Sequence, residues 1–105
     1  MSEGLDRLFA TIAARKGADP TQSYTAKLLA QGVEKCAKKF GEEATETVIA
    51  AIQKDKTELA KESADVLYHL AVLWAASGIT PEDVYTVLKA REGASGLEEK
   101  ASRKS

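Results

Sequence analysis

Apolar side chains recur at steps of three and four residues along most of this chain of 105 residues, which is the spacing of one face of an α-helix. Leu5, Leu8, Phe9 and Ile12 are the first example. No stretch alternates apolar and polar residues between turn signals in the way that a half-buried β-strand does. The pattern therefore predicts one all-α domain over residues 1–91, a helical bundle of four to five helices.

Capping residues, prolines and glycines divide this pattern into segments, because they favour helix starts, first turns and helix ends respectively. The predicted helices run from Ser2 to Lys16, from Ser23 to about Leu29, from Val33 to Gln53, from Thr57 to Ser77, and onward from Thr80-Pro81-Glu82-Asp83. Asp55 or Thr57 is expected to cap the fourth. Gly41 lies inside the third, where it indicates a kink or a close approach. Residues 18–22 are expected to form a loop and residues 92–105 a mobile tail.

The fourth predicted helix is apolar on almost every side between Val66 and Ala76. A helix of this kind has to be covered all round. Three short companion helices in so small a chain are not expected to cover it alone. We therefore expect a homodimer, in which a second copy completes the bundle.

Composition limits the partners of this chain. The formal net charge of -1 gives no general attraction to nucleic acid or to an anionic membrane, so any electrostatic function must be local. Cys36 is the only cysteine, which excludes an internal disulfide and a cysteine-based zinc site. The first residues lack the features of a signal peptide, and the uncharged run from Val66 to Ile79 is too short to span a bilayer. A cytoplasmic location is expected.

Two acidic pairs of identical spacing, Glu43 with Glu46 and Glu62 with Asp65, flank Lys54 symmetrically. If the two long helices fold back on each other about Lys54, Glu46 comes level with Glu62 and Glu43 with Asp65. Four converging carboxylates repel one another unless protons or cations neutralise them. Oxygen ligands of this kind suit Mg²⁺ or Mn²⁺. The spacing thus predicts a divalent-metal site with Glu43, Glu46, Glu62 and Asp65 as ligands.

Two simpler interpretations of the charged residues remain open. The acids can belong to solvated helix faces, where the lysines around them offset their charge. His69 follows Asp65 by one turn, but a diiron bundle needs two histidines and this chain has one. His69 is therefore interpreted as a hydrogen-bonded residue at the edge of the core, with a ligand or base role as the alternative.

Lys35, Lys38 and Lys39 precede the acids on the third predicted helix, and Lys39 lies one turn before Glu43. Ammonium groups beside a metal centre suit a polyphosphate substrate, whose charge they neutralise together with the metal. The alternative is ion pairing along the helix, Lys38 with Glu42 and Lys39 with Glu43, which is worth only tenths of a kcal/mol at a surface. Lys27 is a weaker candidate of the same type.

Three blocks of sequence resemble one known family. These are Ser23-Tyr24-Thr25-Ala26-Lys27-Leu28-Leu29, the stretch Gly32–Ala51 with its Gly-Glu-Glu-Ala-Thr-Glu motif, and Glu62-Ser63-Ala64-Asp65-Val66-Leu67-Tyr68-His69-Leu70. Together they resemble the phosphoribosyl-ATP pyrophosphohydrolases of histidine biosynthesis. The acids alone match the broader MazG-like superfamily of all-α nucleoside triphosphate pyrophosphatases, which does not define a substrate.

The resemblance implies Mg²⁺-dependent hydrolysis of 1-(5-phosphoribosyl)-ATP to 1-(5-phosphoribosyl)-AMP and pyrophosphate. By analogy, Glu43 and Glu46 act in catalysis as metal ligands, and Glu42 is either an outer ligand or the group that orients water. The implied substrate-binding residues are Lys35, Lys38, Lys39, Ser23, Tyr24 and Thr25. Two other functions stay open: a house-cleaning pyrophosphatase with other nucleotide substrates, and a helical dimerisation module without activity.

Overall fold

The computed structural model describes residues 3–93, and within that range it contains five helices and no strand. The helices are α1 (Glu3–Ala14), α2 (Tyr24–Gln31), α3 (Val33–Ile52), α4 (Lys56–Ser77) and α5 (Pro81–Ala90). The all-α prediction is confirmed. The predicted cap Ser2 and, from residue 94 on, the predicted tail lie outside the described residues. None of the five helices combines the length and the apolar character that a bilayer crossing requires.

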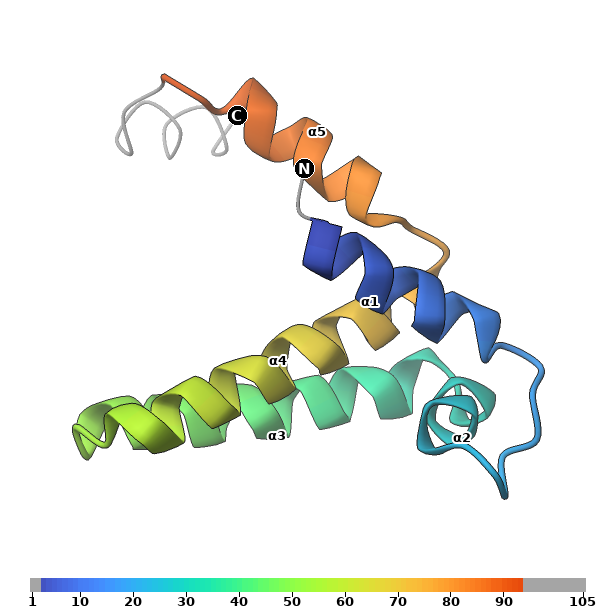
Figure 1. Cartoon of the computed structure of the whole chain (residues 1–105), viewed down its shortest axis with the longest axis horizontal. Helices are drawn as coiled ribbons and strands as arrows, with labels where there is room; N and C mark the ends of the chain where they lie inside the picture. Colours follow the sequence, from blue (N-terminus) through green and yellow to red (C-terminus); the bar gives the residue numbers. More distant parts are fainter. Residues whose placement is uncertain (1–2, 94–105) are drawn as a thin grey trace.

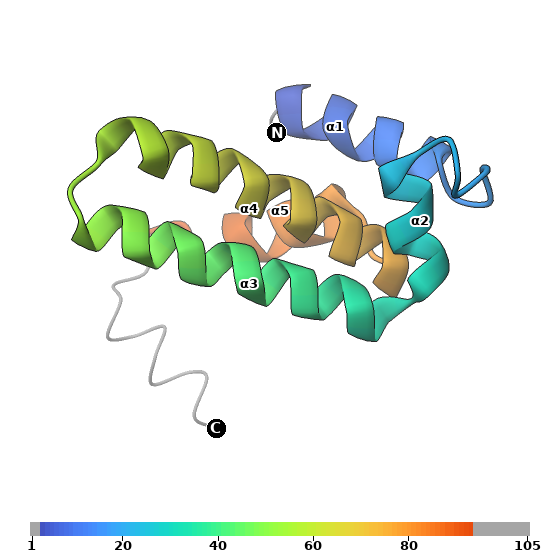
Figure 2. The same ribbon diagram turned by 90° about the horizontal axis from the view of Figure 1, so that it is seen from below.

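Helices α3 and α4 form an antiparallel hairpin, which is the centre of the fold (Figure 1). The chain reverses at Lys54, which has a positive φ of 60°. Asp55 is the cap of α4, since its carboxylate accepts a hydrogen bond of 3.0 Å from the backbone N–H of Glu58. The hairpin therefore folds about Lys54, as the symmetric spacing of the acids predicts. The turn lies at the end of the hairpin away from α2 (Figure 2).

The hydrophobic core lies where α1 and α2 pack against the half of the hairpin away from this turn. Its buried members are Ile12, Leu28, Cys36, Ala71, Val72 and Ala75. The Cys36 thiol donates a hydrogen bond of 3.2 Å to the carbonyl of Leu28 and thereby links α3 to α2. Cys36 is thus a structural residue, and burial raises the pKa of its thiol, which makes it less reactive.

Helix α5 follows a left-handed glycine, Gly78, and begins with a capping box between Thr80 and Asp83. The hydroxyl of Tyr85 donates a hydrogen bond of 3.2 Å to the Asp6 carboxylate and so attaches α5 to α1. Helix α1 lies between α5 and the hairpin (Figure 1).

One chain covers more of α4 than its sequence predicts. Val72 and Ala71 are fully buried and Trp74 is 9% exposed, whereas Leu67 is half-exposed. Most of the other large apolar side chains left uncovered on the hairpin lie on α3 toward the turn, and Ile52 is 75% exposed. On the hairpin, the uncovered apolar surface therefore lies mostly on α3 in the half next to the turn rather than along the whole of α4.

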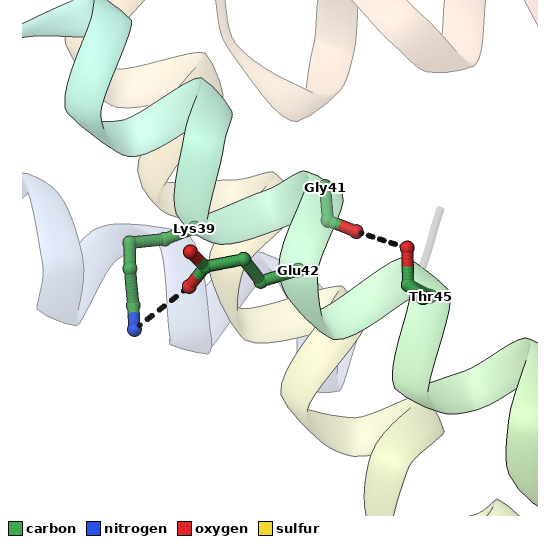
Figure 3. A network of polar contacts seen from close by, with 4 residues as sticks. All are labelled: Lys39, Gly41, Glu42 and Thr45. Carbon is green, nitrogen blue, oxygen red and sulfur yellow. Dashed lines mark hydrogen bonds and ion pairs between the residues drawn. The ribbon is translucent and has the colours of Figure 1, made fainter.

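Helix α3 continues through Gly41 without a break. A Cβ added at Gly41 would meet nothing within 4 Å, so no close approach within the described residues explains this glycine. Its carbonyl accepts a hydrogen bond of 3.0 Å from the Thr45 hydroxyl one turn later (Figure 3).

Candidate metal and phosphate site

Three carboxylates converge between α3 and α4. Glu43 supplies one from α3, and Glu62 and Asp65 each supply one from α4. One oxygen of each lies within 4.8 Å of the others. Mg²⁺ holds its oxygen ligands at about 2.1 Å, so ligands on opposite sides of the ion are about 4.2 Å apart. The three oxygens therefore lie close to the spacing that one such ion requires, and their convergence is the one that the hairpin register predicts for these three residues.

Glu46, the fourth predicted ligand, borders this group instead of joining it. It lines a groove of about 300 Å³ together with Ile49, Ala50, Gln53, Glu58 and Glu62. Ala50 is buried and its small side chain leaves space beside Glu46. The groove thus extends the acidic cluster toward the turn of the hairpin.

The cluster is electrostatically unsatisfied. Oxygen Oε2 of Glu62 is buried and has no hydrogen-bond partner within residues 3–93. Burial, the nearby carboxyl groups of Glu58 and Glu46, and the charge of Asp65 raise the pKa of Glu62 to about 7. Burial, followed by the charges of Glu46 and Asp65, also raises the pKa of Glu43. Groups that hold protons this strongly lose them to a bound divalent cation, so these residues fit Mg²⁺ or Mn²⁺.

Glu58, which the sequence analysis does not assign to the site, also lines this groove. It lies one turn before Glu62 and, in the register about Lys54, level with Ala50. Its Oε2 is 3.6 Å from Nζ of Lys61. The register that places Glu46 level with Glu62 also places Glu58 beside Ala50, so it could have identified Glu58 as part of the groove.

Glu42 is exposed and lies outside the group of three carboxylates. Its Oε1 is 3.3 Å from Nζ of Lys39 (Figure 3). This hydrogen-bonded pair, together with the Tyr24 side chain, raises the pKa of Lys39. The structure thus has Lys39 paired with Glu42, and neither of the two ion pairs predicted at four-residue spacing is formed.

A second groove, of about 270 Å³, lies between α2 and α3. It is lined by Tyr24, Lys27, Leu28, Gln31, Lys35 and Lys39. Two of the three predicted phosphate-binding lysines, Lys35 and Lys39, line this groove, and Lys27 joins them from α2. Lys38 is exposed and lines neither groove.

The three predicted residues at the start of α2 differ in their surroundings. The Ser23 hydroxyl caps α2 by accepting a hydrogen bond of 3.1 Å from the N–H of Ala26. The hydroxyls of Thr25 and Tyr68 are hydrogen-bonded to each other. Ser23 and Thr25 therefore both hold α2 in position, Ser23 as its cap and Thr25 through its contact with Tyr68. Tyr24 alone among the three lines the groove, and it is 53% exposed.

His69 lies at the edge of the core, as predicted, but the predicted hydrogen bond is missing at Nδ1. This atom is buried and has no partner within the described part of the chain. The ring lies edge-on to Tyr68 and Tyr24, with centroid distances of 5.0 and 6.4 Å. Burial and the charge of Lys39 lower the pKa of His69.

The chain is an all-α protein in which the facing acids of an antiparallel hairpin lie beside a lysine-lined groove, an arrangement suited to a hydrolase of phosphoanhydrides. The chain belongs to the phosphoribosyl-ATP pyrophosphohydrolase (PRA-PH) family, whose profile matches residues 5–92.

Curated relatives agree with this family over nearly their full length. The chain is 62% identical to the phosphoribosyl-ATP pyrophosphatase of Cereibacter sphaeroides over 99 residues, which are 94% of this chain and 96% of the relative. It is 65% identical to the protein of that name from Parvibaculum lavamentivorans, over 94% of this chain and 91% of the relative. It is 60% identical to the Azospirillum brasilense protein of the same name, over 96% of this chain and 91% of the relative.

Proposed function

We propose that this chain hydrolyses 1-(5-phosphoribosyl)-ATP between its α and β phosphates, giving 1-(5-phosphoribosyl)-AMP and pyrophosphate in histidine biosynthesis. The observation that carries the proposal is the convergence of Glu43, Glu62 and Asp65 in a member of this family. The nucleotide substrate and the unpaired thiol of Cys36 support a cytoplasmic location as part of the same proposal.

The proposed cofactor is Mg²⁺, with Mn²⁺ as a substitute of similar chemistry. Glu43, Glu62 and Asp65 would hold it directly, and Glu46 would complete the ligand set from the edge of the groove. Such an ion lowers the pKa of a bound water and neutralises charge on the departing pyrophosphate. The buried, unpartnered Oε2 of Glu62 supports this assignment, because it is an oxygen that lacks a donor or a cation.

The remaining proposed roles belong to residues beside the cluster. Glu42, which forms an ion pair with Lys39, either orients the attacking water or acts as an outer ligand. Lys39, together with Lys35 and Lys38, is proposed to neutralise phosphate charge. Tyr24 is proposed to contact substrate directly, whereas Ser23 and Thr25 would act on substrate by holding α2 in place.

Turnover with matched substrates tests this proposal. Purified protein with Mg²⁺ is expected to cleave phosphoribosyl-ATP at least about a hundredfold faster, in kcat/KM, than ATP or dUTP, and to lose this activity in excess EDTA. Comparable rates for all three nucleotides would support the house-cleaning alternative. Absence of any turnover with Mg²⁺ or Mn²⁺ would support a dimerisation module. Full activity in EDTA would remove the metal from the proposal.

We also propose that the chain is a homodimer, whose interface includes the exposed apolar side chains of α3 near the turn. Val48, Ile49 and Ile52 are 56%, 48% and 75% exposed, which is unusual for a cluster of large apolar residues in a monomer. Ile52→Glu is expected to convert a dimer to a monomer in sedimentation at micromolar concentration. Glu34→Gln on the same helix serves as the control. A wild-type protein that sediments as a monomer would refute the dimer.

A further inference from the structure

Three of the six residues that line the groove between α2 and α3 are lysines, and no carboxylate of the described residues lines it. Lys27, Lys35 and Lys39 border one space of about 270 Å³. Of these three lysines only Lys39 has an acidic partner within residues 3–93, and the ammonium groups of Lys27 and Lys35 pair with no carboxylate there. Like charges gathered in one groove repel each other, and a bound anion relieves that repulsion. The groove therefore has the properties of an anion site.

Local structure holds this groove open for a ligand. Gly32, with a φ of 91°, makes the bend between α2 and α3 that turns Lys27 toward Lys35, and a residue with a side chain would be strained there. The Ser23 cap and the contact between the hydroxyls of Thr25 and Tyr68 keep α2 in position. The phenol of Tyr24 and the amide of Gln31 add neutral hydrogen-bond donors on the rim.

The position of the groove along α3 separates it from the acidic cluster. Lys39 lies one turn from Glu43, whereas Lys35 lies eight residues away, which is about 12 Å along the helix axis. The β phosphate of the substrate is joined to the α phosphate through one bridging oxygen, and the γ phosphate is joined to the β phosphate in the same way, so the triphosphate stays near the acidic cluster where its α–β bond is cleaved. The remaining phosphate of the substrate is a monoester on the second ribose, at the far end of the molecule.

We infer that the groove formed by Lys27, Lys35 and Tyr24 binds the phosphomonoester of the second ribose. This inference rests on the proposed function, and it assigns recognition of the group that distinguishes this substrate from ATP. Lys39, which lines the groove and lies one turn from Glu43 on α3, contacts the triphosphate side. Lys27 thereby becomes a specificity-determining residue, although it lies outside the acidic motif.

The test uses three ligands that carry different parts of the substrate. The product 1-(5-phosphoribosyl)-AMP carries the second ribose phosphate and the α phosphate, AMP carries the α phosphate alone, and pyrophosphate carries only the metal-facing end. AMP binding is expected to be unaffected by the substitutions Lys27→Met and Lys35→Met, and an equal weakening of AMP and product binding would assign the groove to the α phosphate and overturn the inference. In the full-length protein with Mg²⁺, Lys27→Met and Lys35→Met are expected to weaken binding of the product about tenfold to a hundredfold, as loss of a charge-assisted hydrogen bond does. Binding of pyrophosphate is expected to change by less than about twofold. KM for phosphoribosyl-ATP should rise in parallel, with kcat within about threefold.

Lys16→Met is the matched control. It removes the same charge from an exposed position that lines neither groove. The ligand affinities, KM and kcat of this variant are expected to stay within about twofold of wild type. Equal weakening of product and pyrophosphate would assign the groove to the triphosphate and overturn the inference. Unchanged product binding in both variants would overturn it as well. If wild-type protein does not cleave phosphoribosyl-ATP at all, the proposed function fails, and that result is distinct from either of these.

Discussion

The two halves of the α3–α4 hairpin differ in what they contribute. In the half next to α2, side chains such as Val72 and Cys36 are buried under α1 and α2 and form the core. In the half next to the turn, Glu43 and Glu62 face each other and Ile52 stands exposed. One half thus supplies stability, and the other half gathers groups that oppose folding.

This division has a physical reason. Converging carboxylates cost free energy in the folded state, and a separate, well-packed core has to offset that cost. The buried cluster around Val72 lies on the same two helices as the acids, so it holds the backbone of the acidic site in register without contributing polar groups to it. Changes in one half should therefore affect activity and changes in the other should affect stability.

The largest expected effect is on activity, from a change in the acidic half. Glu46→Gln keeps the size of the side chain but removes a charge from the edge of the metal site. Since metal catalysis is worth several kcal/mol, we expect kcat to fall by at least about a thousandfold. Steady-state turnover of phosphoribosyl-ATP measures the loss, and far-ultraviolet circular dichroism should show an unchanged helical content.

Glu34→Gln is the control for this change, since Glu34 is an exposed acid in the first turn of α3 and lines neither groove. Its turnover is expected to stay within about twofold of wild type. Wild-type turnover of the Glu46 variant would exclude Glu46 from the site.

A substitution in the half of the hairpin that forms the core is expected to change the stability of the protein. Ile12 is 1% exposed and packs from α1 against the hairpin. Ile12→Ala is expected to lower the free energy of unfolding by about 2–5 kcal/mol, measured by urea denaturation, because it leaves a cavity. Val87→Ala at a half-exposed position of α5 should cost about 0.5 kcal/mol or less. If kcat of the folded Ile12 variant fell as far as that of the Glu46 variant, the two halves would not be separable.

The smallest expected effect is on the pH dependence of the stability of the metal-free protein. The pKa of Glu62 is raised to about 7, so the folded state binds a proton more tightly than the unfolded state, in which a Glu has a pKa near 4.5. Stability from this proton is present below about pH 4.5 and is lost as the pH rises through 7. The thermal midpoint in EDTA is therefore expected to fall between pH 5 and pH 8.

Glu62→Gln, which cannot ionise, should flatten this dependence, and Mg²⁺ should reverse it, because the ion binds the ionised form. If the midpoint of the metal-free wild type rose over the same range, burial beside other carboxyl groups would not be what controls the protonation of Glu62.

Local signals in the sequence determined the helix boundaries. Ser23, Asp55 and Thr80 cap their helices as predicted, because a cap needs only its own side chain and the next few backbone N–H groups. The spacing of the acids about Lys54 likewise determined their convergence, since an antiparallel hairpin has one register once its turn is known.

Tertiary structure alone decided which side chains share a groove. The sequence grouped Lys38 with Lys35, but the structure groups Lys35 with Lys27, because this depends on how α2 is rotated against α3. It also decided that Lys39 pairs with Glu42 and that Glu58 joins the acids. Long charged side chains choose among such partners by tenths of a kcal/mol, whereas caps and buried residues are selected by larger energies. The helices and the hairpin could therefore be predicted from the sequence. The partners of the charged side chains could not.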